Sequence, residues 1–231
     1  MPGGGMNFEL TDDQELIRRS VAELARKFDD HYWMEKDQAH EFPTEFYNAI
    51  AQGGWLGMTI PTEYGGHGLG ITEATVLLEE VAKSGGGMNA ASSIHLSIFG
   101  MQPVVVHGSE ELKARTLPSV ATGEVHVCFG VTEPGAGLDT SRITTFAKRD
   151  GDRYVVNGRK VWISKAMESD KILLLTRTKS AIKPVRMRSD ERRLGVRCRE
   201  RFTISSWCLR RSDSATTERT PPVRASGPGL R

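Results

Sequence analysis

The chain has 231 residues, of which 38% are hydrophobic and 26% charged, and this composition suits one or two globular domains with a buried core. The net charge of +2 hides an asymmetry, because residues 184–231 hold twelve arginines, no lysine and five acidic residues, a balance of +7 that leaves −5 for residues 1–183. Three cysteines without a CxxC pair predict neither a disulfide framework nor a metal site, and the lack of a signal-like or membrane-spanning apolar run favours a cytoplasmic location.

The first part of the chain has helical periodicity. Thr11 and Gln14 have the spacing of a capping box, and the apolar stripe that follows predicts an amphipathic helix with one core-facing side. The stripe consists of Ile17, Val21, Leu24 and Phe28. Four further helices, with glycines at their ends, are predicted at 43–52, 72–83, 89–106 and 109–116. Together these helices predict an all-α domain over residues 8–123.

A strand-rich region is predicted to follow at residues 124–178. Residues 124–131 alternate between polar and apolar, and Asp150-Gly151 and Asn157-Gly158 are dipeptides typical of tight hairpins. Further strands are predicted at 143–148, 154–156, 160–164 and 172–177. The region therefore predicts a small antiparallel barrel or sheet, and the whole chain an α+β fold.

A glycine-rich loop, Thr132-Glu133-Pro134-Gly135-Ala136-Gly137, follows the first predicted strand. Gly135 and Gly137 lack the β-carbons that would keep the backbone away from a phosphate, so the backbone N–H groups can face an anion. Glu133 precedes a proline in a polar loop, which predicts a solvated turn carboxylate and not a catalytic base.

This loop, the segment Lys160-Val161-Trp162-Ile163-Ser164 and the upstream residues 60–69 together resemble the flavin site of acyl-CoA dehydrogenases, and the resemblance spans about residues 8–178. It implies an N-terminal helical domain, a middle β domain and a C-terminal four-helix bundle. It also implies FAD as cofactor and an acyl-CoA thioester as the substrate oxidised to a trans-2-enoyl thioester. An electron-transfer flavoprotein or similar acceptor and a homo-oligomer are the partners that the family implies.

The resemblance also implies which residues bind FAD. They are Phe129, Gly130, Val131, Thr132, Gly137 and Leu138 in the first segment, and Trp162, Ile163 and Ser164 in the second. Thr132 would lie near the flavin ring, Trp162 against the isoalloxazine, and the Ser164 hydroxyl near N5. Leu138 stands where relatives commonly carry serine, which leaves the choice of acyl group open.

No catalytic residue is predicted, because in most of the family the base is a glutamate on the C-terminal bundle and residues 179–231 show no helical periodicity that matches it. We interpret 179–231 as an arginine-rich tail that is disordered or derived from a frameshift. Nucleic acid is not expected as a partner, because no nucleic-acid-binding signature accompanies the arginines. Two hypotheses follow: a truncated acyl-CoA dehydrogenase with negligible turnover alone, or a non-catalytic fragment that acts as a weak flavin-binding or partner-binding module.

Overall fold

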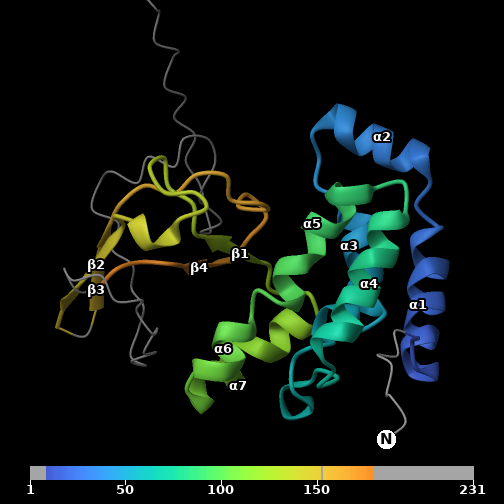
Figure 1. The fold of residues 1–231 in the computed structure, drawn as a ribbon, viewed down its shortest axis with the longest axis horizontal. Coiled ribbons are helices and arrows are strands. Elements are labelled where there is room, and N and C mark those ends of the chain that lie inside the picture. Colours follow the sequence, from blue (N-terminus) through green and yellow to red (C-terminus); the bar gives the residue numbers. More distant parts are fainter. Residues whose placement is uncertain (1–8, 152, 179–231) are drawn as a thin grey trace, which may run out of the picture.

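A computed structural model describes residues 9–151 and 153–178, and within this part helices come first and short strands follow (Figure 1). The α-helices are α1 (Asp12–Ala25), α2 (Asp30–Ala39), α3 (Thr44–Gln52), α4 (Ile71–Lys83), α5 (Gly87–Ile98), α6 (Gln102–His107) and α7 (Glu110–Ala121). The strands are β1 (Val127–Gly130), β2 (Phe146–Asp150), β3 (Arg153–Asn157) and β4 (Lys171–Leu174). The α+β prediction is confirmed, while the predicted tail at 179–231 lies outside the described residues.

Helix α1 begins with the capping box that the sequence predicts. The Gln14 backbone N–H donates to Thr11 Oγ1 over 3.3 Å, and the Thr11 N–H donates to Gln14 Oε1 over 3.1 Å. Ile17 and Val21 are buried in the core that α1 shares with α3, α4 and α5. Phe28 also packs on this core, although it lies beyond the end of the helix.

The helices differ from the predictions in three places. Helix α2 was not predicted, because Trp33 is the one buried residue of this described helix and a single buried residue gives no periodic pattern. The segment predicted as one helix at 89–106 divides into α5 and α6, and Pro103 lies in the first turn of α6, where its missing N–H costs no hydrogen bond. Helix α7 continues through the exposed Pro118 to Ala121 because Leu117 and Val120 are buried beyond the predicted end.

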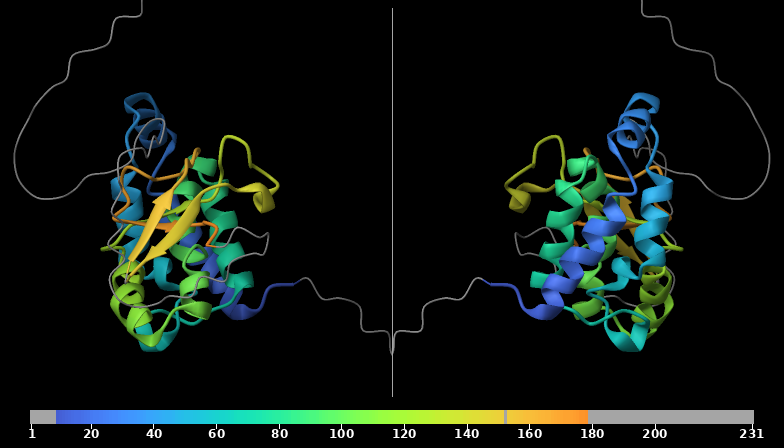
Figure 2. Two further views of the ribbon diagram at one scale, coloured as in Figure 1. Left: turned by 90° about the vertical axis from the view of Figure 1, so that its left-hand side faces the viewer. Right: turned by 90° about the vertical axis from the view of Figure 1, so that its right-hand side faces the viewer.

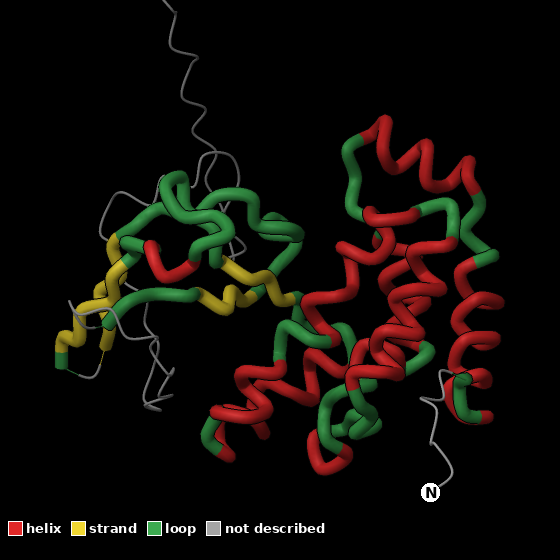
Figure 3. Tube along the Cα trace, viewed as in Figure 1, coloured by secondary structure: helices red, strands yellow, loops and turns green. Residues whose placement is uncertain are grey.

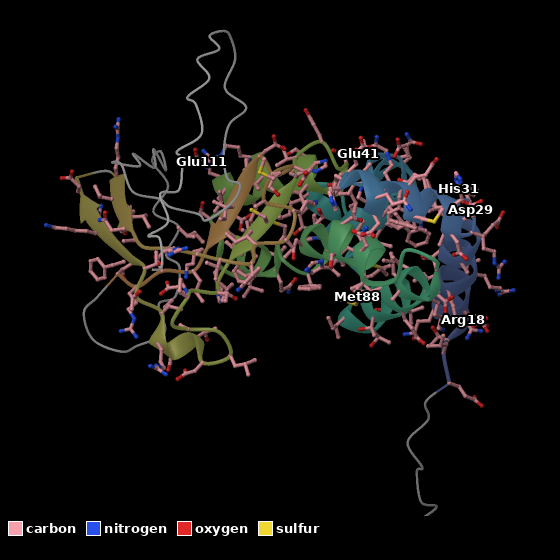
Figure 4. All side chains as sticks on the ribbon, turned by 90° about the horizontal axis from the view of Figure 1, so that it is seen from above. Arg18, Asp29, His31, Glu41, Met88 and Glu111 are labelled. Atoms are coloured by element: carbon pink, nitrogen blue, oxygen red, sulfur yellow. The ribbon has the colours of Figure 1, made fainter. Side chains whose placement is uncertain are left out.

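The helices form one group with two apolar cores. The larger core lies among α1, α3, α4 and α5, and the smaller joins α6, α7 and Val127 at the start of β1. Charged side chains such as Arg18 and Glu41 lie at the surface of the helical group, as seen from above in Figure 4. Strand β1 therefore begins against the second helical core, which fixes the sheet region to the helices.

The strands form two separate pairs. Strand β1 pairs in parallel with β4, with Cys128 opposite Ile172, whereas β2 and β3 form an antiparallel hairpin. Gly151, at φ +60°, follows Asp150 in the predicted hairpin turn. The end-on views show that this hairpin lies at the opposite end of the molecule from α1 (Figure 2). The described strands do not close into a barrel, and the antiparallel prediction is wrong for β1 and β4.

The predicted strand at 160–164 is also wrong, because this segment is irregular and is drawn as loop in Figure 3. Trp162 and Lys165 have φ values of +58° and +59°, a left-handed conformation that interrupts any strand. Asn157-Gly158 consequently ends β3 without forming a second hairpin. Gly158 is required there because a β-carbon would overlap the backbone of Thr145.

Candidate functional site

The two motif segments meet beside the carboxyl end of β1. The Val161 N–H donates to the Thr132 carbonyl oxygen over 2.9 Å, and the Leu175 N–H donates to the Gly130 carbonyl oxygen over 3.0 Å. The first bond joins segments that lie about 30 residues apart in the sequence. The pairing of these segments, predicted from the motifs, is therefore present although the second segment is a loop.

The glycine-rich loop is a tight turn with an open outer side. Glu133 N–H donates to the Ala136 carbonyl over 3.0 Å, and Ala136 N–H donates to the Glu133 carbonyl over 3.1 Å. A β-carbon added at Gly135 or Gly137 would meet no protein atom within 4 Å. The backbone on this side is thus accessible to a ligand.

Glu133 is buried at 5% exposure, so the prediction of a solvated carboxylate is wrong. Its Oε2 accepts hydrogen bonds from the backbone N–H and the hydroxyl of Thr144, over 2.6 and 2.8 Å. Its Oε1 accepts from the Thr145 N–H and from Lys160 Nζ, each over 2.9 Å. Lys160 is fully buried and also donates to the Val131 carbonyl over 2.7 Å.

These contacts fix the charge of the pair. Burial raises the pKa of Glu133, but the hydrogen bonds from Thr145, Thr144 and Lys160 outweigh burial and lower that pKa to about 2. Burial lowers the pKa of Lys160, and the Glu133 carboxylate opposes this shift. Glu133 and Lys160 therefore form an ion pair that joins the glycine-rich turn to the start of the second segment, and Glu133 is a weak base.

The second segment presents an aromatic side chain to the outside. Trp162 is 90% exposed despite its size, and Leu138 on the first segment is fully exposed. An exposed indole on a backbone with positive φ is uncommon, because large side chains favour burial and negative φ. Such unfavourable local geometry is concentrated at functional sites, which supports a ligand-binding role for this loop.

The predicted site residues differ in their exposure. Gly137, Leu138, Trp162 and Ser164 are exposed, and Phe129, Val131, Thr132 and Ile163 are half-buried. Gly130 is buried, and a β-carbon there would press on the side-chain ends of Ile172 and Leu174, so its glycine serves the packing of β1 on β4.

Sequence reasoning missed two lysines. Lys160 belongs to the second motif, but the sequence does not reveal its ion pair with Glu133, because the two residues lie 27 positions apart. Lys165 follows the motif directly and places Nζ 3.1 Å from the Ser93 carbonyl on α5. Lysines flank the tryptophan at positions 160 and 165, but a single sequence does not distinguish buried from exposed lysines.

The arrangement suits an anionic ligand with a flat aromatic ring. The open backbone of the turn can donate N–H groups to phosphate, and the Trp162 indole offers a surface for stacking. The Thr132 and Ser164 hydroxyls can form hydrogen bonds with polar atoms at a ring edge. In the described part of the chain there is no group of three or more histidine, cysteine or acidic side chains that could hold a metal ion.

The fold and the candidate site define a protein with a helical domain, a small sheet domain and two adjoining loops, at 132–137 and 160–164, that are suited to a ligand. The model of the acyl-CoA dehydrogenase N-terminal domain matches residues 11–124, and that of the acyl-CoA dehydrogenase middle domain matches residues 128–203. The chain belongs to the acyl-CoA dehydrogenase family. The second match extends beyond residue 178, into the part that the structure does not describe.

Relatives and solved structures that are similar to this chain support its membership of the family. The acyl-CoA dehydrogenase FadE12 of Mycobacterium tuberculosis is 31% identical over 178 residues, which are 76% of this chain and 45% of the relative. The crystal structure of an acyl-CoA dehydrogenase from Geobacillus kaustophilus matches with a TM-score of 0.70 and 28% identity, over 78% of this chain and 47% of that one. An FAD complex of PigA matches with a TM-score of 0.70 and 25% identity, over 77% of this chain and 47% of that one. The chain spans less than half the length of these proteins.

Proposed function

We propose that the chain binds FAD between its two motif loops, and that this site serves the α,β-dehydrogenation of an acyl-CoA thioester. The observation that carries the proposal is the hydrogen bond from Val161 N–H to the Thr132 carbonyl. This bond places the loop of the exposed Trp162 beside the loop with the open glycine backbone. One ligand with a flat ring and a pyrophosphate would contact both loops.

The residues fit FAD in their chemistry. The backbone of Gly135 and Gly137 would receive the pyrophosphate, Trp162 would stack on the isoalloxazine, and the hydroxyls of Thr132 and Ser164 would contact polar ring atoms. FAD supplies the hydride acceptor when it is bound. The FAD complex of PigA, a protein of similar fold, supports this choice of cofactor.

Glu133 does not remove the substrate proton in this proposal. Its pKa is lowered to about 2, and its two oxygens accept hydrogen bonds from Thr144, Thr145 and Lys160. A general base needs free access to the proton and a higher pKa. The role of Glu133 is therefore to hold the glycine-rich turn, and no described residue is assigned as the base.

An acyl-CoA as substrate, an electron-transfer flavoprotein as electron acceptor and a homo-oligomeric state are further parts of the proposal, and they rest on family membership. The exposed Leu138 on the site loop points to an apolar contact there. In the part that the structure describes, no helix has the length and apolar character needed to cross a membrane.

The visible spectrum of the purified full chain tests the proposal. Added FAD is expected to shift and sharpen the flavin bands on binding. Bleaching of these bands by an acyl-CoA series under anaerobic conditions would show that the chain also carries out the dehydrogenation. Binding without bleaching would support the alternative of a non-catalytic flavin-binding module. Absence of FAD binding would refute the proposed site.

A further inference from the structure

The loop that carries Trp162 and Ser164 is held at both ends by lysines. Lys160, before the loop, enters the sheet domain and donates to Glu133 and Val131. Lys165, after the loop, extends in another direction and donates to the Ser93 carbonyl on α5 over 3.1 Å. The loop therefore connects the two domains through side chains as well as through the backbone.

The Lys165 ammonium lies in an aromatic environment within the helical domain. Its Nζ is 4.4 Å from the centroid of the Tyr47 ring on α3 and 5.8 Å from that of Phe42. Tyr47 is fully buried and its hydroxyl lies 3.5 Å from Ser97 Oγ on α5. A cation above a desolvated ring is held more tightly than one at the surface.

We propose that Lys165 is a positioning residue that fixes the flavin-facing loop of Trp162 and Ser164 against α3 and α5. The inference rests on the proposed FAD site. Trp162 and Lys165 both have positive φ, and a backbone in this conformation keeps its shape only when its surroundings hold it. The contacts of Lys160 and Lys165 supply that support on either side.

Stability alone does not explain a lysine at this position. Burial lowers the pKa of Lys165 to about 8, and the nearby Cys128, Glu168 and Asp170 only partly oppose this effect. A methionine would fill nearly the same volume without the cost of burying a charge. The lysine supplies what methionine lacks, which is a directed bond to α5 and attraction to the Tyr47 ring.

The first test is hydrogen exchange on the full chain without flavin, comparing wild type with Lys165→Met. We expect the backbone amides of residues 161–166 to exchange at least about tenfold faster in the variant, while those of α1 stay unchanged. Lys148→Met, at an exposed lysine of β2, is the matched control and should leave the loop unaffected. Unchanged exchange in Lys165→Met would overturn the inference.

The second test is FAD affinity of the same variants, with thermal stability measured alongside. We expect Lys165→Met to weaken FAD binding about tenfold without lowering the melting temperature, because the apolar side chain removes a buried charge. Lys165→Gln keeps an N–H donor for Ser93 and should recover part of the affinity. Faster loop exchange with unchanged affinity would overturn the positioning role and leave the FAD site standing. A wild-type chain that fails to bind FAD would refute the proposed function, and the exchange data would still report on the anchor.

Discussion

Removing either member of the Glu133–Lys160 pair should destabilise the protein by different amounts. The perturbations are Glu133→Gln and Lys160→Met. After Lys160→Met, the carboxylate keeps its three hydrogen bonds from Thr144 and Thr145. After Glu133→Gln, Lys160 keeps its bond to the Val131 carbonyl but loses its counterion while fully buried.

The magnitudes follow from these remaining partners. In Glu133→Gln, the uncompensated buried charge of Lys160 costs about 3–5 kcal/mol. The glutamine amide also places an N–H group where the carboxylate had an acceptor, so a Thr144 donor loses its hydrogen bond. Loss of one charged hydrogen bond costs about 1.5–3 kcal/mol, and the apolar methionine offsets part of that loss. We therefore expect Glu133→Gln to cost about 2 kcal/mol more than Lys160→Met. The double variant should cost less than the two single changes added together, because the two residues are in contact.

Urea denaturation of the full chain, followed by circular dichroism, measures these free energies of unfolding. Lys148→Met is the control and should stay within about 0.5 kcal/mol of wild type, because this lysine is exposed. A cost for Lys160→Met equal to or above that of Glu133→Gln would show that the carboxylate depends on Lys160 alone. A strictly additive double variant would show that the pair is not coupled, and either result would contradict this account of the ion pair.

Three further predictions concern other parts of the chain. Gly66→Ala should destabilise the protein by more than about 3 kcal/mol, because the added β-carbon would overlap the Ile60 carbonyl. Gly65→Ala, at φ +79° with open space around it, should cost only about 1–2 kcal/mol. Thermal melts of the two variants measure this difference, and equal losses of stability would contradict the close packing at Gly66. Burial, with Lys165 nearby, lowers the pKa of His126 to about 4, so the unfolded chain binds the proton more tightly and stability should fall as pH drops from 6.5 to 4. Urea titrations across that pH range should show the free energy of unfolding falling in wild type and changing less in His126→Gln. The same pH dependence in both proteins would contradict a lowered pKa of His126. Trp162→Ala should weaken FAD binding roughly tenfold with little change in melting temperature, and a large loss of stability would place the indole in the core instead.

Much of the helical domain could be predicted from sequence because its helices are amphipathic. The capping box at Thr11 and the stripe from Ile17 specify α1 locally, without reference to distant residues. Helix α2 could not be found in this way, since a helix with Trp33 as its buried residue has no stripe to detect. The break between α5 and α6 follows from Pro103. This proline is visible in the sequence, but a proline does not always end a helix, as Pro118 within α7 shows.

The meeting of the two motif loops was predictable from the sequence, but the contacts within and around them were not. The glycines and Trp162 mark the two loops, and the loops do meet. The direction of β4 relative to β1 and the burial of Glu133 both depend on contacts between distant segments. A polar residue beside a proline normally lies in solvent, and here Lys160 and the Thr144-Thr145 backbone provide the bonds that water would otherwise supply.

The parallel pairing of β1 with β4 sets an order of events during synthesis. Residues 131–170 lie between the two strands, so β1 is synthesised before its partner exists. The ends of so long a loop close at an entropic cost that later contacts must repay, and such distant pairings form slowly. The helical domain can fold while the ribosome is still adding the sheet region. The proposed ligand site, which needs the loops at 131–138 and 160–164 within this interval, is completed late, and a nascent chain that has exposed only its helices does not yet present it.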